Sequence, residues 1–281
     1  MSRPALIDIG ANLAHDSFDA DRELVIERAR EAGVVAVIVT GSTLDDSNRA
    51  IALCRRFPGL LRATAGVHPH HATTLQTADA PRLAELLADP MVVAAGECGL
   101  DYFRNFSPPA EQRRAFALQL GLADRHDRPL FLHQRDAHAD FLAMLKEHPR
   151  PAARAVLHCF SGGPAELDDC LALGLSIGVT GWICDERRGQ ALRDAAPRIP
   201  ADRLMFETDA PYLLPRTMQP KPAHRRNEPA FLAAILEETA RCRGQTPAAL
   251  AALTTANACR FFGLTLRESD EPQQGATYNL A

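Results

Sequence analysis

One pattern constrains the fold of this chain more than any other: short apolar segments alternate with longer amphipathic segments through eight rounds. Each apolar segment is almost continuous in hydrophobic residues and ends at Gly, Pro or polar residues, which is typical of strands buried on both faces. The eight predicted strands are residues 5–12, 34–41, 61–68, 91–99, 129–135, 155–160, 175–181 and 204–209. Between them, segments such as 22–32 and 111–125 carry apolar residues at helical spacing.

This alternation predicts a parallel sheet with crossover helices. Eight repeats in 281 residues give roughly 35 residues per repeat, which suits an α/β fold of the (β/α)8 TIM-barrel type. A doubly wound open sheet is the alternative, but the GxGxxG fingerprint that often follows its first strand does not occur in the sequence. We expect one domain over residues 1–268, with helices at 228–243 and 247–262, and a polar tail at 269–281.

The cysteine pattern predicts a reducing compartment. The chain has seven cysteines, an odd number, and no CxxC pair, which favours free thiols over a zinc ribbon or a disulfide framework. No apolar run approaches the ~20 residues that span a bilayer, and the first residues lead directly into a predicted strand. We therefore expect a cytoplasmic monomer without a membrane partner. The net charge of −4 gives no bulk attraction to nucleic acid, so such a partner needs a local basic patch.

Side chains that commonly bind metals fall at the ends of the predicted strands. In a TIM barrel, catalytic residues come from the C-terminal ends of several strands, which meet at one mouth. The residues in question are His68, His70, Glu97, His133, His158 and Asp209. Imidazole nitrogen combined with carboxylate oxygen suits a divalent ion, and such an ion makes hydroxide available near neutral pH.

Two of these residues are the candidate catalytic acids. Asp209 is our candidate for both metal ligand and general base, and Glu97 bridges two ions if two bind. Each residue also has a purely structural interpretation: a strand-end histidine can hydrogen-bond locally, Asp209 can cap a turn, and Glu97 can pair with an arginine. The coincidence of several such residues at corresponding strand ends favours the metal site.

Arginines follow the same strands and suggest a phosphate-bearing substrate. A guanidinium binds two phosphate oxygens at once, whereas a charge run by itself is often only a solvated face. The candidate substrate-binding arginines are Arg104, Arg135, Arg187, Arg188, Arg225 and Arg226. Aromatic residues that stack on bases or pack in the core also follow strand ends: Tyr102, Phe103, Phe106, Phe160, Trp182 and Tyr212.

Several segments resemble the TatD family of metal-dependent deoxyribonucleases, one of the amidohydrolase-like barrels. The similar segments are 8–12 (DIGAN), 65–70 (AGVHPH), 96–101 (GECGLD), 157–161 (LHCFS) and 207–214 (ETDAPYLL). Segments 182–188 (WICDERR) and 225–229 (RRNEP) resemble the TatD branch itself. The resemblance covers nearly the whole chain.

The resemblance implies metal ligands at Glu97, His133, His158 and Asp209. It also implies a 3′ to 5′ exonuclease that acts on single-stranded DNA and on RNA, in DNA repair or DNA degradation. Many family members carry Asp-x-His-x-His on the first strand, whereas this chain has Gly10 and Asn12 at the two histidine positions. This departure makes a tight second metal site doubtful and favours Mg²⁺, with Mn²⁺ and Zn²⁺ as alternatives.

In the leading hypothesis, the enzyme is a hydrolase of ester bonds, a phosphodiesterase. His70 and the arginines neutralise the phosphate charge, while His68 contacts the phosphate or supports the ligands. A second hypothesis keeps the barrel and metal but assigns an amidohydrolase-type substrate or a D-aminoacyl-tRNA. A third treats the barrel as a non-catalytic scaffold for metal or nucleic acid.

Overall fold

The structure, a computed structural model, describes residues 4–266. Within these residues, eight parallel strands follow one another around one sheet in the order of the sequence. They are β1 (Leu6–Ala11), β2 (Val34–Val39), β3 (Leu61–Ala65), β4 (Val92–Asp101), β5 (Leu130–Arg135), β6 (Ala155–Leu157), β7 (Ser176–Val179) and β8 (Leu204–Phe206). Asp209 N donates to Gly10 O at 2.8 Å and Asn12 N donates to Ala210 O at 2.7 Å, so the first and last strands meet. The predicted TIM barrel is confirmed.

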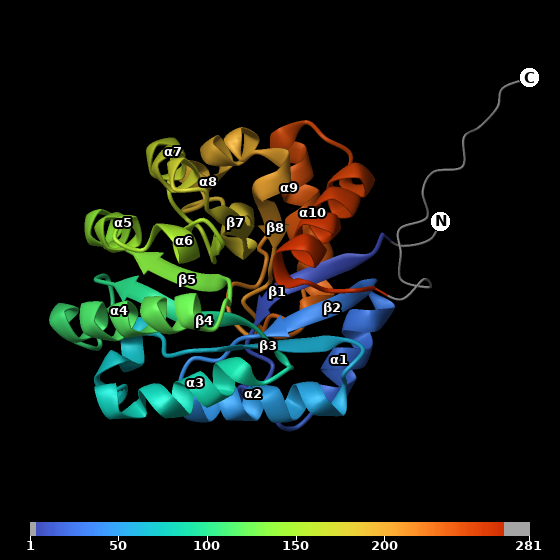
Figure 1. Ribbon diagram of the computed structural model, residues 1–281. Coiled ribbons are helices and arrows are strands. Elements are labelled where there is room, and N and C mark those ends of the chain that lie inside the picture. Colours follow the sequence, from blue (N-terminus) through green and yellow to red (C-terminus); the bar gives the residue numbers. More distant parts are fainter. Residues whose placement is uncertain (1–3, 267–281) are drawn as a thin grey trace, which may run out of the picture.

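Helices lie around the outside of the strands (Figure 1). They are α1 (Arg22–Glu31), α2 (Leu44–Arg56), α3 (Ala80–Ala88), α4 (Pro109–Arg125), α5 (His138–Lys146), α6 (Pro149–Ala152), α7 (Pro164–Ala172), α8 (Gln190–Ala195), α9 (Leu232–Arg243) and α10 (Pro247–Phe262). Short 3₁₀ turns complete the connections: η1 (Asp16–Phe18), η2 (Pro69–Thr74), η3 (Thr77–Asp79), η4 (Gly181–Cys184), η5 (Ala196–Arg198), η6 (Ala201–Arg203) and η7 (Pro229–Phe231). None of the helices in the described part of the chain is long and apolar enough to cross a membrane.

Local sequence signals explain where several helices begin. The Thr43 side chain accepts a hydrogen bond from Asp46 N at the start of α2, and the Thr246 side chain accepts one from Ala249 N at the start of α10. Proline occupies the first helical turn of α4, α7 and α10, where its missing N–H is not needed. These caps satisfy or remove backbone donors that have no partner inside the helix.

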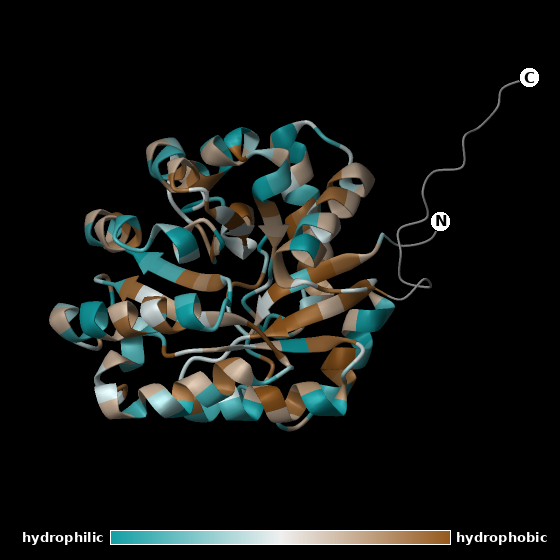
Figure 2. Ribbon diagram, viewed as in Figure 1, coloured by the Kyte–Doolittle hydropathy of each residue, from teal (hydrophilic) through white to brown (hydrophobic). Residues whose placement is uncertain are grey.

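Two apolar clusters fill the molecule, and the hydrophobic residues concentrate on the strands (Figure 2). The larger cluster packs the strands against the surrounding helices. The smaller one contains alternate strand residues, including Ile7 and Ile9, together with Phe131. Ala258 and Phe262 of α10 pack against this cluster. Because side chains alternate across a strand, these alternate positions line the barrel interior and fill it as a core.

Six strands end one to three residues earlier than the sequence pattern predicts, whereas β5 ends at the predicted residue and β4 ends two residues later, at Asp101. β6 ends at Leu157 and β8 at Phe206, so His158 and Asp209 lie in the segments just beyond them. The backbone turns there, because Cys159 has φ 51° and Asp209 has φ 54°. The predicted helix at 228–243 begins as the 3₁₀ turn η7 and becomes α-helical at Leu232. The predicted domain limit at 268 and the tail at 269–281 lie outside the described residues.

Candidate active site

A pocket of about 620 Å³ opens at the C-terminal ends of the strands; we call it the mouth pocket. Its walls come from the C-terminal ends of all eight strands and the segments that follow them. The predicted site residues that line it are His68, His70, Glu97, Arg104, His133, Arg135, His158, Arg188 and Asp209. The structure thus brings all four predicted metal ligands to one pocket.

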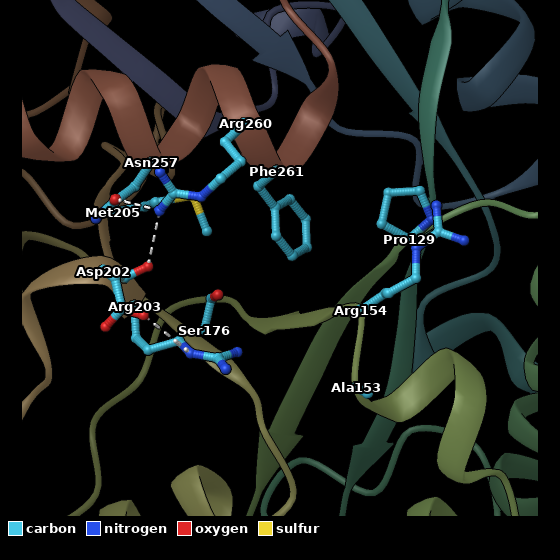
Figure 3. A pocket seen from close by; sticks show the side chains of 10 residues that line it. All are labelled: Pro129, Ala153, Arg154, Ser176, Asp202, Arg203, Met205, Asn257, Arg260 and Phe261. Carbon is cyan, nitrogen blue, oxygen red and sulfur yellow. Dashed lines mark hydrogen bonds and ion pairs between the residues drawn. The ribbon is translucent and has the colours of Figure 1, made fainter.

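A smaller pocket, of about 340 Å³, lies among residues that precede or begin β5 to β8, beside α10 (Figure 3). Ser176 and Arg203 contribute to it from the N-terminal ends of β7 and β8, and Phe261 contributes from α10. The predicted ligands and substrate-binding residues do not line it. The chemistry therefore belongs to the mouth pocket.

The buried carboxylate of Glu97 lies at the centre of the mouth pocket. Its Oε1 atom is 3.1 Å from His133 Nδ1, 3.3 Å from His158 Nε2 and 3.3 Å from His68 Nε2. Burial opposes ionisation, but the surrounding imidazoles outweigh it and hold the pKa of Glu97 well below its usual value. Glu97 is therefore a carboxylate at neutral pH.

Two further acids hold the outer nitrogens of the two predicted histidine ligands. His133 Nε2 lies 3.1 Å from Asp101 Oδ2, and His158 Nδ1 lies 2.7 Å from Glu207 Oε2. Burial lowers the pKa of both histidines, but the neighbouring carboxylates outweigh burial and raise it. Each ring thus turns its other nitrogen toward Glu97. An outer carboxylate that fixes the ring and tautomer is the usual support of a metal-binding histidine.

Glu207 fits only because two glycines flank it. A Cβ atom at Gly10 would lie 2.4 Å from Glu207 Oε2, and one at Gly178 would lie 2.4 Å from Glu207 Oε1. Glu207 is fully buried, and its Oε1 accepts a 2.5 Å hydrogen bond from Cys159 N. The space beside Gly10 on the first strand is therefore occupied by a carboxylate that supports His158.

Asp101 and Glu207 are supporting acids that are absent from the predicted site residues. A signal for Glu207 was present, because alternation along the eighth strand places it on the same side as the core residue Met205 and as Asp209. Asp101 lies four residues after Glu97, on the same side by alternation, but the predicted strand stops at residue 99, and the pairing of β4 with β5 is needed to place it near His133.

Asp209 faces the same group of residues from the segment after β8. Asn12 Nδ2 donates to Asp209 Oδ1 at 3.1 Å, so the second altered first-strand position orients this acid. Burial, together with the charges of Glu97 and Glu207, raises the pKa of Asp209 to about 7. Ligand atoms of Asp209, His158 and Cys159 lie within 4.8 Å of one another. Burial raises the pKa of the Cys159 thiol to about 12, so without a bound ion this thiol is protonated at neutral pH.

His68 is placed to support the site through a hydrogen bond. Its Nδ1 accepts a 3.0 Å hydrogen bond from His70 N, so the ring proton resides on Nε2, which faces Glu97 Oε1. Burial lowers the pKa of His68 to about 4, which keeps the ring neutral. His70 Nε2 lies 2.9 Å from Asp101 Oδ2, so Asp101 connects His70 with His133.

The donor set fits a divalent cation. Two carboxylates and two imidazoles converge, and the buried acids Glu97, Asp101 and Glu207 concentrate negative charge in a region with little water. His133 and His158, whose pKa values these acids raise, partly balance the negative charge, and a divalent cation between Glu97, His133, His158 and Asp209 would replace their protons in that role. The residues present could therefore hold such an ion with their supporting acids in place.

The predicted arginines divide into two groups. Arg104 and Arg135 line the mouth pocket, and within residues 4–266 neither forms an ion pair with an acid. Arg188 also lines it but is bound to Asp185 at 2.8 Å. Arg187, Arg225 and Arg226 are not among the lining residues.

Arg226 contacts η1, the residue that precedes α1 and Glu228 instead of the mouth pocket. Its guanidinium binds Asp21 at 2.7 Å and Glu228 at 2.9 Å, and it donates to Ser17 O at 2.7 Å. Arg187 and Arg225 are exposed. Arg226 thus holds the loop after β8 against η1 and Asp21 and does not face the mouth pocket.

The predicted aromatic residues also separate by environment. Phe160 is buried in the outer core, and Tyr102 packs beside that core while its hydroxyl donates to Asp140 at 2.7 Å. Phe106, Trp182 and Tyr212 line the mouth pocket, and Phe103 lies under the guanidinium of Arg135. Base stacking therefore remains available to the second group.

Comparison with known proteins shows the family of this chain. Residues 7–263 match the family described as TatD related DNase. A relative from Erwinia amylovora, named "3'-5' ssDNA/RNA exonuclease TatD", is 52% identical over 259 residues, covering 92% of this chain and 100% of the relative.

Solved structures agree on the fold. The YJJV TatD homologue from Escherichia coli K12 superposes with a TM-score of 0.84 at 30% identity, covering 92% of this chain and 98% of that one. An uncharacterised amidohydrolase from Saccharomyces cerevisiae superposes with a TM-score of 0.80 at 24% identity, covering 92% of this chain and 100% of that one, and shows the barrel fold alone.

Proposed function

Because this chain belongs to the TatD related DNase family, we propose that it is a metal-dependent 3′–5′ exonuclease that hydrolyses phosphodiester bonds of single-stranded DNA and RNA. The observation that carries the proposal is the convergence on Glu97 of His133 and His158, at 3.1 and 3.3 Å, inside the mouth pocket. Unpaired cations at the same pocket suit a polyanionic substrate.

We assign the metal to Glu97, His133, His158 and Asp209. When bound, a divalent cation supplies a Lewis acid that stabilises charge on the phosphoryl group and makes water a stronger acid. Asp101 and Glu207 keep the two histidine rings oriented toward it. The presence of Gly10 and Asn12 at the two first-strand positions, instead of histidines, favours Mg²⁺, with Mn²⁺ or Zn²⁺ as alternatives.

The protein's own groups act on water and phosphate. Asp209, which lines the mouth pocket beside His158, accepts the proton of the attacking water. His70, Arg104 and Arg135 bind the phosphate oxygens and offset the charge that develops on them. His68, through its contact with Glu97, orients that carboxylate.

Other aspects of the proposal concern cellular context. All seven cysteines lie within the described residues and are unpaired, which supports a cytoplasmic location. A monomeric state, and a part in DNA repair or DNA degradation, remain predictions from the sequence.

A time course with a 5′-labelled single-stranded oligonucleotide, compared in Mg²⁺, Mn²⁺ and Zn²⁺, tests the proposal. We expect a ladder that shortens from the 3′ end. Asp209→Asn should lower the rate of cleavage by about 10²- to 10⁴-fold, the usual contribution of a general base. Glu228→Gln, at a buried glutamate outside the mouth pocket, is the matched control. The proposal would be overturned if the enzyme left DNA and RNA uncut but hydrolysed a cyclic amide or a D-aminoacyl-tRNA in parallel assays. That result would favour an amidohydrolase-type enzyme.

A further inference from the structure

Exposed aromatic rings concentrate at the mouth pocket. Within residues 4–266, the large hydrophobic side chains that are mostly exposed are Leu24 (62%), Phe103 (54%), Phe106 (67%) and Tyr212 (52%). Phe106 and Tyr212 line the mouth pocket, and Phe103 contacts its residue Arg135. We call these three residues the aromatic rim. Exposed apolar side chains that gather at one place mark a binding surface.

The aromatic rim is held by edge contacts and stays open to solvent. Phe106 lies 4.8 Å from the His70 ring at an interplanar angle of 60°, and Tyr212 lies 5.9 Å from the His15 ring at 76°. Both contacts are edge-type, and more than half of each aromatic side chain remains exposed. Phe106 follows β4 and Tyr212 follows β8, so the two rings come from different walls of the pocket.

Cations lie between these walls. The Arg135 guanidinium sits 3.9 Å from the Phe103 ring centre and 6.0 Å from that of Trp182. Trp182 in turn lies 4.5 Å from the Arg188 guanidinium. Alternating rings and guanidiniums are the composition that single-strand binding proteins use, with stacked bases on the rings and phosphates on the cations.

From this arrangement we propose that the aromatic rim is a binding site for unpaired nucleobases next to the scissile phosphate. This inference rests on the proposed function and adds the feature of the substrate that the site recognises. The faces of a base inside a duplex are covered by its neighbours, so only a base free to unstack can lie against Phe106 or Tyr212. A pocket of about 620 Å³ is also of small-ligand size, which suits the end of one strand rather than a duplex.

The test compares two 5′-labelled single strands that are identical except that the last three nucleotides at the 3′ end of one strand are abasic. Both strands carry the same phosphates, so a difference in kcat/KM between them reports recognition of bases. We expect the intact strand to be preferred by the wild type. Phe106→Ala and Tyr212→Ala should each reduce that preference by about 5- to 150-fold, the effect of losing one stacked base. The change should come mainly through KM.

Two variants keep the test specific. Leu24→Ala removes a comparably exposed apolar side chain from α1, away from the mouth pocket, and should keep the wild-type preference. Tyr212→Phe keeps the ring without the hydroxyl and should retain the preference that Tyr212→Ala loses.

The outcomes separate the two proposals. Nuclease activity with equal kcat/KM on both strands, or Ala variants that keep the wild-type preference, would overturn the base-binding site while leaving the exonuclease proposal intact. A wild-type enzyme that cleaves neither strand with Mg²⁺, Mn²⁺ or Zn²⁺ would overturn both.

Discussion

Replacing Glu207 with glutamine should weaken metal binding without removing any proposed ligand. The Glu207 carboxylate accepts hydrogen bonds from His158 Nδ1 at 2.7 Å and from Cys159 N at 2.5 Å. A glutamine that keeps the bond from Cys159 N turns its NH₂ group toward His158 Nδ1. His158 Nδ1 must then accept, and the ring proton moves to Nε2, the atom that faces Glu97 at 3.3 Å.

That proton must be displaced before His158 can bind an ion. Loss of an outer carboxylate behind a metal-binding histidine typically costs about 10- to 100-fold in metal affinity, or about 1.4 to 2.7 kcal/mol. We therefore expect Glu207→Gln to raise the Mn²⁺ dissociation constant by that factor. Excess metal should restore most of the nuclease activity, because the variant retains Glu97, His133 and Asp209.

Isothermal titration with Mn²⁺ measures this change directly. Glu228→Gln is the matched control, because Glu228 is also a buried glutamate but binds Arg28 at 2.8 Å and Arg226 at 2.9 Å. It should lower the melting temperature and keep the wild-type Mn²⁺ dissociation constant. A folded Glu207→Gln protein with wild-type Mn²⁺ affinity would refute the reasoning.

Three further predictions follow from the same contacts. Gly10→Ala places a methyl group 2.4 Å from Glu207 Oε2. It should lower the free energy of unfolding by about 1–3 kcal/mol and weaken metal binding. A variant whose urea unfolding and Mn²⁺ dissociation constant both match the wild type would contradict this close fit. Arg226→Gln should lower the free energy of unfolding by about 1 kcal/mol at pH 7, after allowance for solvent screening. The reason is that Arg226 and Arg28 hold the pKa of Asp21 at about 2, below its ordinary 3.8. An acid with a depressed pKa contributes stability above pH 3.8, and this stability is lost as the pH falls toward 2. The free energies of unfolding of wild type and variant should therefore converge between pH 3.8 and 2. A difference that stays constant with pH would exclude Asp21 as the cause. Chelation by EDTA should abolish nuclease activity, and Mn²⁺ should raise the melting temperature of the chelated protein by binding the folded state; a melting temperature that does not respond to Mn²⁺ would argue against the cation site.

The barrel and its mouth were predictable because both follow from periodicity. Short buried strands alternating with amphipathic helices leave few topologies, and the C-terminal ends of parallel strands must meet at one edge. That argument places Glu97 and His133 near each other although 36 residues separate them. It also places His158 and Asp209 there, even though their strands stop at Leu157 and Phe206.

The supporting contacts were not predictable in the same way. Spacing indicates which edge a histidine reaches, but not which acid lies behind its ring, so Asp101 and Glu207 needed three-dimensional contacts. The direction of a loop arginine is equally hidden in the sequence. Arg226 binds Asp21, 205 positions earlier, and nothing in the local charge run indicates that pairing.

The central claim is that Glu97, His133, His158 and Asp209 hold one cation. Anomalous diffraction from crystals soaked in Mn²⁺ tests it most directly. We predict a peak in the mouth pocket, within coordination distance of His133 Nδ1, His158 Nε2 and the two carboxylates. An ordered Mn²⁺ peak bound elsewhere, with these four side chains uncoordinated, would contradict the account.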